Sequence, residues 1–415
     1  MDREIGVDID YEFVERVQRL ADHEDFLAKA EENDRLARYP AESVNALKGL
    51  GVPGMSVHRQ FGGLGHNIAT RAKVAEVIAY SDPTTAACMN MHWSALDLIG
   101  PYAFVVEGMG DLMTEAATRQ AMFCGAASIP SGDLDAAKAG VRFRRVDGGW
   151  LGGGRVGYAT GSAGADYAGA IGTVVDDSGE PVGRKLLVLF PPVGTPGIRI
   201  IEDWDAMGLR GTATNTIEVN EAFVEDKYAF VRDLDEPQPT VTDAGGERQH
   251  MAFGLLNLSG GGMQLGHCRH IVDYIAGYLT ERKGGIAVQI KGQEPSARGD
   301  FGWAQATFGR MAWWVHTAET VLYQAASHSL HPDTTPESRA HRSLYAAYHI
   351  RRMTEEVARE SFRLAGAHGI VTARPYERMF RDLMAQSAII FKTPEMEIQL
   401  GRAALGREFD PMPGG

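Results

Sequence analysis

The chain has 415 residues, of which 44% are hydrophobic and 23% charged, and its formal net charge is −13. This length exceeds what one hydrophobic core usually organises, so we expect two or three packed units with the composition of a globular protein. The acidic balance, with no cluster of lysines and arginines, argues against a nucleic-acid partner. The sequence contains no run of about 18 apolar residues, so no membrane span is predicted.

Two features of the sequence point to the cytoplasm. The N-terminus, Met1-Asp2-Arg3-Glu4, is not a basic segment followed by an apolar one, so no signal peptide is expected. Cys88, Cys124 and Cys268 lie far apart, are odd in number and show no CxxC spacing. That pattern indicates buried thiols in a reducing compartment.

Residues 1–121 have a helical pattern. Val74, Val77 and Ile78, for example, repeat at i, i+3 and i+4. We therefore predict an N-terminal α-helical domain.

Residues 122–235 change to the pattern of strands and turns. Alternation over 141–146 is followed by Asp147-Gly148-Gly149 and a new apolar start, which is typical of a hairpin. Segments 185–190 and 216–219 are further candidate strands. We predict a central β domain of about six to eight strands, folded as a barrel or sandwich.

Residues 236–415 are helical again, after a linker at 233–246 that is rich in proline, glycine and acidic residues. The expected helices are separated by an insert at 284–300 and form an antiparallel four-helix bundle. They lie near residues 265–279, 303–328, 338–365 and 377–405. The fold class is therefore α+β with several domains.

Motifs along the chain resemble the acyl-CoA dehydrogenase superfamily, and they occur in the family's order. They are Phe61-Gly62-Gly63-Leu64-Gly65, Tyr158-Ala159-Thr160-Gly161-Ser162, the run from Asp203 to Val219, and Glu281-Arg282-Lys283. The resemblance implies the same order of helical domain, β domain and four-helix bundle. It also implies FAD, with FMN as an alternative, and a homotetramer.

The resemblance assigns four residues of the β domain to the flavin ring. Ser128, in Ser128-Ile129-Pro130, takes the place of a hydroxyl that bonds the pyrimidine side of the ring. Thr160 is expected to hydrogen-bond the flavin, and Tyr158 and Trp204 to pack against it. Such contacts tune the electronics of a flavin.

The rest of the cofactor is assigned to the bundle. In the family, an arginine at the position of Arg282 reaches the FAD pyrophosphate of a neighbouring subunit, and a guanidinium fork suits a diphosphate. Gly366 and Gly369, in Gly366-Ala367-His368-Gly369, match the glycine turn that lets the backbone approach the partner's cofactor.

A catalytic base is missing at the expected positions. A dehydrogenase of this family needs a carboxylate to take the substrate's α-proton. The three positions that could carry this carboxylate hold Leu256, Ile390 and Thr393. Glu395 is the candidate for a displaced base.

The missing base leaves three functions open. The favoured one is a monooxygenase that uses reduced flavin and O2, because the same fold serves two-component enzymes that lack this glutamate. In that branch Thr160-Gly161-Ser162 is a suitable strand end, Ser162 is a candidate catalytic residue, and His92 is a candidate acid or peroxide stabiliser. The alternatives are an acyl-CoA or acyl-carrier-protein dehydrogenase with a displaced base, and a flavin-binding or structural paralogue without catalysis.

The partners follow from these functions. We expect a small-molecule or acyl-thioester substrate, together with a separate flavin reductase or a carrier protein. No metal is expected: His267 and His270 have a spacing that could bind zinc but no evident third ligand, and we interpret them as a pair on the bundle surface.

Overall fold

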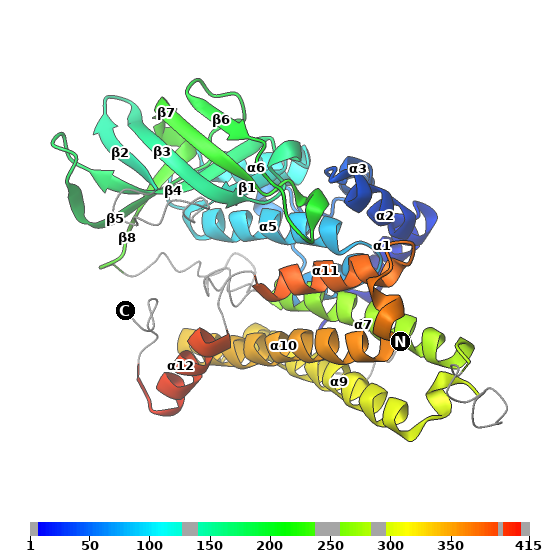
Figure 1. The fold of residues 1–415 in the computed structure, drawn as a ribbon. Helices are drawn as coiled ribbons and strands as arrows, with labels where there is room; N and C mark the ends of the chain where they lie inside the picture. The colour runs from blue at the N-terminus through cyan, green and yellow to red at the C-terminus, as the bar shows by residue number, and fades with distance from the viewer. Residues whose placement is uncertain (1–6, 127–139, 237–257, 284–295, 389–392, 408–415) are drawn as a thin grey trace.

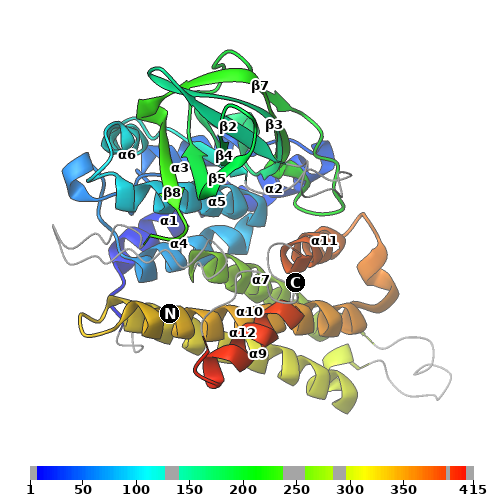
Figure 2. The same ribbon diagram turned by 90° about the vertical axis from the view of Figure 1, so that its left-hand side faces the viewer.

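The computed structural model describes residues 7–126, 140–236, 258–283, 296–388 and 393–407. Their order is helical, then a sheet, then helical again, which confirms the predicted architecture (Figure 1). The sheet forms one layer and the C-terminal helices form the opposite one, with N-terminal helices between them (Figure 2). None of the described helices is both long and apolar enough to cross a membrane.

The N-terminal region contains six α-helices: α1 (Tyr11–His23), α2 (Phe26–Leu36), α3 (Ala41–Gly49), α4 (Ile68–Ser81), α5 (Pro83–Ile99) and α6 (Met109–Thr118). Four of them, α1, α2, α4 and α5, begin with a side chain that caps the helix. The Asp82 carboxylate, for example, accepts hydrogen bonds from the backbone N–H groups of Thr84 and Thr85 at 3.0 Å. Almost every residue of α4 and α5 is buried. These two helices therefore form the middle of the molecule, as expected for helices that are covered on all sides.

The central region is one mixed sheet of eight strands, where the sequence allowed a barrel or a sandwich. The strands are β1 (Phe123–Ala126), β2 (Val141–Val146), β3 (Gly149–Ala159), β4 (Tyr167–Val175), β5 (Pro181–Leu189), β6 (Ile198–Ile201), β7 (Asn215–Glu225) and β8 (Ala229–Asp233). Their order is β6-β7-β3-β2-β4-β5-β8, and β1 pairs with β4. The hairpin predicted after residue 146 is confirmed, because Val146 pairs with Gly149.

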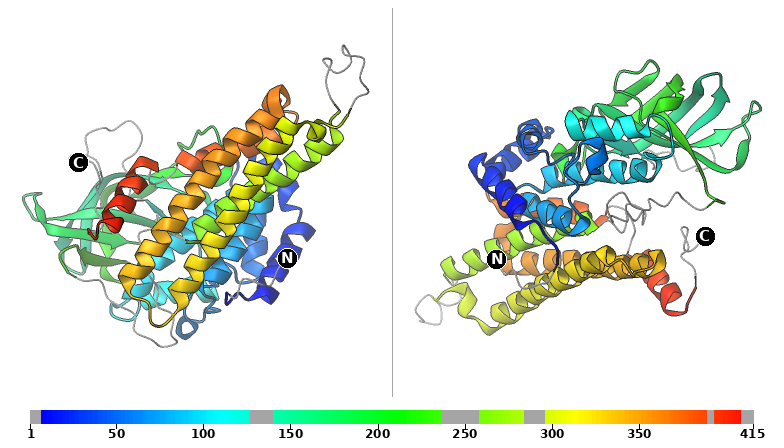
Figure 3. Two further views of the ribbon diagram at one scale, coloured as in Figure 1. Left: turned by 90° about the horizontal axis from the view of Figure 1, so that it is seen from below. Right: turned by 180° about the vertical axis from the view of Figure 1, so that it is seen from behind.

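The C-terminal region differs from the prediction at its end. Its helices are α7 (Leu258–Glu281), α9 (Gly302–Leu330), α10 (Pro336–Ala365), α11 (Pro375–Ala388) and α12 (Thr393–Ala404). The single helix expected over 377–405 is wrong, since α11 and α12 are separate. Pro394 lies in the first turn of α12, where a proline begins a helix but cannot continue one from before. Seen from below, α9 and α10 run side by side (Figure 3).

Close contact between α4 and α7 joins the N-terminal helices to the bundle. A Cβ atom at Gly262 or Gly266 would lie 2.0 Å from the carbonyl oxygen of Ala72 or Glu76, respectively, so only glycine permits this approach. Beside it, the buried Glu76 carboxylate bonds Lys73 at 3.0 Å. These contacts hold α4 and α7 together backbone to backbone.

Candidate functional site

The motif at residues 203–214, between β6 and β7, docks the sheet onto the helices on both sides. We call this segment the docking loop. A Cβ atom at Gly208 would lie 2.1 Å from the carbonyl oxygen of Arg381 on α11, and one at Gly211 would lie 2.6 Å from that of Arg38, just after α2. Both glycines are therefore required by backbone contact with another element.

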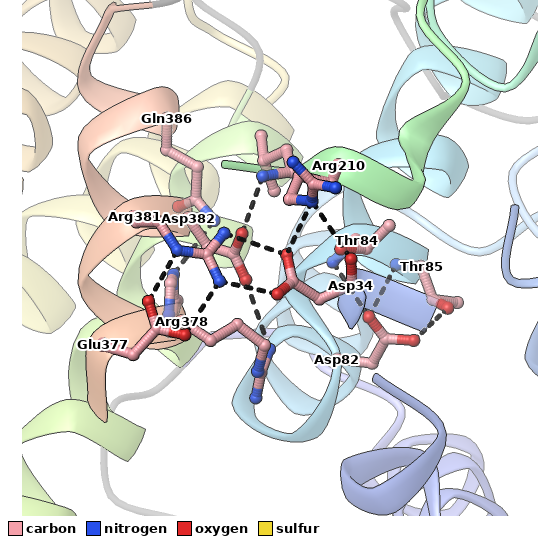
Figure 4. A network of polar contacts seen from close by, with 12 residues as sticks. Asp34, Asp82, Thr84, Thr85, Arg210, Glu377, Arg378, Arg381, Asp382 and Gln386 are labelled. Carbon is pink, nitrogen blue, oxygen red and sulfur yellow. Dashed lines mark hydrogen bonds and ion pairs between the residues drawn. The ribbon is translucent and has the colours of Figure 1, made fainter. Parts of the chain in front are cut away.

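Hydrogen bonds and ion pairs hold the docking loop in place (Figure 4). The Leu209 N–H donates to Asp382 Oδ1 at 2.7 Å. Arg381 makes two bonds to the Asp34 carboxylate, at 3.1 and 2.6 Å, and one to the Met207 carbonyl at 2.8 Å. Arg210 Nε donates to the carbonyl of Asp34 at 3.1 Å. The loop is thus fixed to α2 and α11 at once.

Asp382 is deeply buried, with 1% of its surface exposed. Burial raises the pKa of its carboxyl to about 6, while the nearby Arg378 guanidinium opposes that rise. Arg378 Nη1 donates to Asp382 Oδ2 at 3.2 Å, and both residues lie on α11. The buried acid therefore binds both a guanidinium and the docking loop.

Trp204 and Tyr158, which the resemblance assigned to the flavin ring, contact each other in the structure. Their rings meet edge to face with centroids 6.2 Å apart, and 44% of Tyr158 is exposed. Trp204 is fixed by two hydrogen bonds, from its N–H to Asn215 Oδ1 at 3.2 Å and from Nε1 to the Leu209 carbonyl at 3.1 Å. A rigid aromatic pair with an accessible face suits a planar ligand.

Ser162 lies close to this pair, but its hydroxyl is already used within the protein. It donates to the Ala213 carbonyl at 2.7 Å and accepts from Asn215 Nδ2 at 3.0 Å. With 2% of its surface exposed, Ser162 is a positioning residue for the strand end and not an accessible donor. The expected catalytic role of Ser162 thus becomes an indirect one.

Thr160 stands at the end of β3 with a partly exposed side chain. Its hydroxyl lies 3.0 Å from that of Thr214, which lies 2.7 Å from that of Thr212. Thr212 Oγ1 in turn donates to the Leu209 carbonyl at 2.9 Å. We call these three hydroxyls the hydroxyl relay. It connects the accessible Thr160 to the fixed peptide of Leu209.

His92 is fully buried in α5, and both ring nitrogens bond main-chain groups. Nδ1 accepts from the Phe123 N–H at 3.0 Å, so Nε2 carries the proton and donates to the Pro53 carbonyl at 3.1 Å. Burial lowers the pKa of His92 to about 3. This geometry gives His92 a structural role, joining β1 to α5, in place of the expected acid.

A second group of predicted residues lies at the C-terminal end of α7. Arg282 donates from Nη2 to His368 Nε2, and its carbonyl accepts from the Arg298 N–H at 2.7 Å. Arg298 Nη1 donates to the Tyr278 hydroxyl at 3.2 Å. We call Arg282, Arg298 and His368 the basic cluster. The positive charge of Arg282 is the main reason that the pKa of His368 is lowered.

The basic cluster has the properties that bind a phosphate group. Among the described residues, no carboxylate lies within ion-pair distance of Arg282 or Arg298. Gly366 adopts φ +60°, and a Cβ atom there would be 3.6 Å from Arg298 Nη2. Gly369 is buried, and a Cβ atom would be 2.9 Å from Tyr376. The structure thus brings Arg282 close to the turn that contains Gly366 and Gly369.

The positions of the missing base are only partly described. Thr393 begins α12, and its hydroxyl donates to the Glu355 carboxylate of α10. Leu256 and Ile390 lie outside the described residues, as does Ser128. Glu395 lies in the first turn of α12, a helix that packs on α10 at the lower edge of the bundle, whereas the sheet is at the top (Figure 1). The structure therefore does not bring Glu395 to Tyr158 and Thr160.

The two histidines of α7 lie in different surroundings. His267 is fully buried, so its expected surface position is wrong, and its Nδ1 accepts from Gln386 Nε2 at 3.0 Å. His270 stacks on Tyr80 with ring centroids 4.9 Å apart. Within the described ranges no group of three or more histidine, cysteine or acidic side chains could hold a metal ion.

Comparisons with known proteins identify the family. Residues 10–102 match the model for the acyl-CoA dehydrogenase N-terminal domain, and residues 258–392 match a model for the acyl-CoA dehydrogenase C-terminal domain. Together these matches cover more than half of the chain. The chain belongs to the acyl-CoA dehydrogenase superfamily. As a member of that superfamily it is a flavin-dependent oxidoreductase.

Relatives within the acyl-CoA dehydrogenase superfamily include both of its branches. Indole-3-acetate monooxygenase of Pseudomonas putida is 25% identical over 399 residues, which cover 93% of this chain and 92% of that protein. XiaF from a Streptomyces species, solved with FADH2 and glycerol, aligns with a TM-score of 0.80 and 21% identity, covering 97% of this chain and 96% of XiaF. Glutaryl-coenzyme A dehydrogenase aligns with a TM-score of 0.78 and 18% identity, covering 98% and 96%. The structural likenesses show the fold and do not separate the branches.

Sequence reasoning missed several residues that the structure places at the site. Asp34, Asp382 and Arg298 were not predicted, and Thr212 and Thr214 were quoted within a motif without a role. The threonines could have been found from their i, i+2 spacing after the glycine pair. Nothing in the sequence near Asp34 or Asp382 indicates their role, because the contact is made between distant segments. Asp382, for example, accepts its hydrogen bond from the N–H of Leu209, 173 residues away.

Proposed function

We propose that this protein is the oxygenase component of a two-component flavin-dependent monooxygenase. The observation that carries the proposal is the lack of a carboxylate at the positions of the base. Leu256 and Ile390 cannot accept a proton, and the Thr393 hydroxyl is bonded to Glu355. A dehydrogenase needs that base to remove the α-proton, whereas oxygen insertion does not.

A small aromatic molecule is the substrate class that we propose. One relative that aligns over nearly the whole chain is named as an indole-3-acetate monooxygenase. Electron-rich aromatic rings are also the substrates that react with an electrophilic oxygen donor. One oxygen atom of O2 would enter the ring and the other would leave as water.

The residues present fit a flavin at two places. At the sheet, the accessible Tyr158, the fixed Trp204 and the Thr160 hydroxyl would contact the ring, together with Ser128. At the end of the bundle, the basic cluster would bind the diphosphate of FAD. Arg282 and Arg298 have no carboxylate partner among the described residues, which leaves their positive charge available to the diphosphate. When bound in reduced form, flavin supplies the electron pair that activates O2.

The assembly proposed here is a homotetramer in the cytoplasm. The basic cluster would serve the flavin of a neighbouring subunit, as in the superfamily. A separate reductase would supply the reduced flavin. The work of this chain is then to hold the ring, to keep water from it and to place the substrate beside it.

The docking loop is the part of the chain that orients the ring site. Because Gly208 fits against α11 and Gly211 against the segment just after α2, the loop has little freedom. Trp204 is fixed through Asn215 and Leu209. Ser162 supports the same strand end through Asn215. His92 takes no part in proton transfer in this proposal.

The test is to measure oxygen consumption and product formation with a flavin reductase, NADH and a panel of indoles and phenols. Hydroxylated product that forms only when reductase and O2 are present supports the proposal. The proposal would be overturned in favour of a dehydrogenase if an acyl thioester reduced tightly bound FAD and the electrons then passed to a dye in the absence of oxygen. In that case Glu395→Gln would show whether Glu395 is the displaced base, and protein-bound thioesters would test a carrier partner.

A further inference from the structure

The hydroxyl relay has a geometry that fixes the direction of its hydrogen bonds. It consists of three threonine hydroxyls in a row, Thr160, Thr214 and Thr212, and ends on the Leu209 carbonyl. Each hydroxyl has one hydrogen to donate, and a carbonyl oxygen has none. The hydrogens can therefore be assigned by counting from the carbonyl end.

The assignment begins at Thr212. Its oxygen lies 2.9 Å from the Leu209 carbonyl oxygen, and only Thr212 can supply a hydrogen between them. The contact of 2.7 Å between Thr212 and Thr214 must then contain the hydrogen of Thr214. By the same argument, the contact of 3.0 Å between Thr214 and Thr160 contains the hydrogen of Thr160. The Thr160 oxygen is left with lone pairs only.

The hydrogen bonds of the relay keep this direction because the end of the relay at the Leu209 peptide is held in place. Thr212 is 1% exposed and Thr214 is 8% exposed, so water does not offer them other partners. The Leu209 carbonyl also accepts from Trp204 Nε1 at 3.1 Å, and the Leu209 N–H is held by Asp382 at 2.7 Å. Only Thr160, at the accessible end, is open to a ligand.

We propose that the hydroxyl relay makes Thr160 a hydrogen-bond acceptor for the flavin ring and thereby selects reduced flavin over oxidised flavin. The inference rests on the proposed function, in which Thr160 faces the ring. Reduction adds an N–H to the ring nitrogen N5, while the same nitrogen in oxidised flavin carries a lone pair. A hydrogen-bond acceptor therefore binds the N–H of reduced flavin and is repelled by the lone pair of oxidised flavin.

This selectivity matches the needs of an oxygenase that receives its flavin from another protein. Reduced flavin binds and is retained, and oxidised flavin is released for the next reduction. Thr212 and Thr214 are positioning residues in this scheme, since neither touches the flavin. They act through the hydrogen of Thr160.

The test is to measure the dissociation constants of reduced FAD, under anaerobic conditions, and of oxidised FAD for wild type and Thr212→Val. Valine has the shape of threonine, and the Leu209 carbonyl keeps two N–H donors, from Trp204 and from the Thr212 backbone. The variant frees the hydrogen of Thr214 to turn to Thr160, whose own hydrogen can then reach the flavin.

We expect the ratio of oxidised to reduced dissociation constants to fall about tenfold in Thr212→Val, as for the loss of one hydrogen bond. A tenfold fall lowers the midpoint potential of bound flavin by about 30 mV. Thr212→Ser, which keeps the hydroxyl, should restore the wild-type ratio. Thr173→Val, the same change on β4, is the control and should leave the ratio unchanged.

The outcomes separate this inference from the proposed function. A wild-type preference for reduced flavin that Thr212→Val does not alter overturns the relay, and so does a wild-type preference for oxidised flavin. Oxygen-dependent product formation by wild type, measured separately, decides the proposed function in either case.

Discussion

Replacing Gly208 by alanine should release the docking loop from α11. The added Cβ would lie 2.1 Å from the Arg381 carbonyl oxygen and 2.9 Å from the Asp382 nitrogen, both of them backbone atoms of a helix. Ordinary contact begins near 3.4 Å, so the loop must move by about 1.3 Å. That movement lengthens the Leu209–Asp382 bond from 2.7 Å to about 4 Å, beyond hydrogen-bonding distance.

The loss of stability in Gly208→Ala follows from the steric overlap and the lost hydrogen bond. Overpacking of a buried contact costs about 1–3 kcal/mol, and a lost hydrogen bond to a charged group costs about 1.5–3 kcal/mol. We expect the free energy of unfolding to fall by about 2.5–6 kcal/mol in total. Flavin affinity should fall as well, since Trp204 is fixed through the same Leu209 peptide.

Urea unfolding and fluorescence titration with flavin measure both quantities. Gly309→Ala is the matched control, because that helical glycine of α9 is exposed with no atom within 4 Å of its Cβ position. It should stabilise the protein by about 0.5–1 kcal/mol. Gly211→Ala, whose Cβ would meet the Arg38 carbonyl at 2.6 Å, tests the α2 side if Gly208→Ala does not fold. Wild-type stability and flavin affinity in Gly208→Ala would refute this account of the docking loop.

Three further predictions concern single side chains. His92→Ala should lower the free energy of unfolding by about 2–4 kcal/mol, because two buried main-chain groups lose their partner. The kcat of the flavin-saturated protein should stay near the wild-type value. A large loss of kcat without a loss of stability would restore His92 as a catalytic acid. Burial raises the pKa of Asp382 to about 6, above its value in the unfolded chain, so the folded protein holds this proton more tightly and its stability falls as the pH rises from about 4 to about 6. Urea unfolding below and above that window should show the fall in wild type but not in Asp382→Asn, and equal slopes in both would contradict it. Arg282→Ala should weaken FAD binding about tenfold or more by removing a charge-assisted bond, with little change in unfolding; equal FAD affinity, measured by titration, would remove Arg282 from the cofactor site.

Much of the fold could be read from the sequence because its signals are local. Apolar residues at helical spacing, as at Val74, Val77 and Ile78, and the turn Asp147-Gly148-Gly149 predict helices and a hairpin whatever surrounds them. The single helix expected over 377–405 was wrong, since Pro394 stands in the first turn of α12 and a proline there cannot continue a preceding helix. The prediction was also incomplete for the sheet, since strand order depends on pairings between distant segments.

The site was predicted in part, for the same reason. The motif around Gly208 was recognisable in the sequence, because a glycine at a close backbone contact is a residue type that few others replace. The cofactor role of Arg282 stays a prediction. The roles of individual side chains were not recognisable. His92 is a plausible acid in the sequence, but in the structure both its nitrogens bond main-chain groups far along the chain.

The sequence by itself determined the order of helical and strand regions, the superfamily motifs and the lack of a carboxylate at the base positions. The tertiary structure alone decided which polar groups meet. It placed Asp382 on the Leu209 peptide and set the three threonine hydroxyls in one line, so that Thr160 is left as an acceptor. The physical reason is that a buried polar group takes its properties from its hydrogen-bond partners, and those partners lie far away in the sequence.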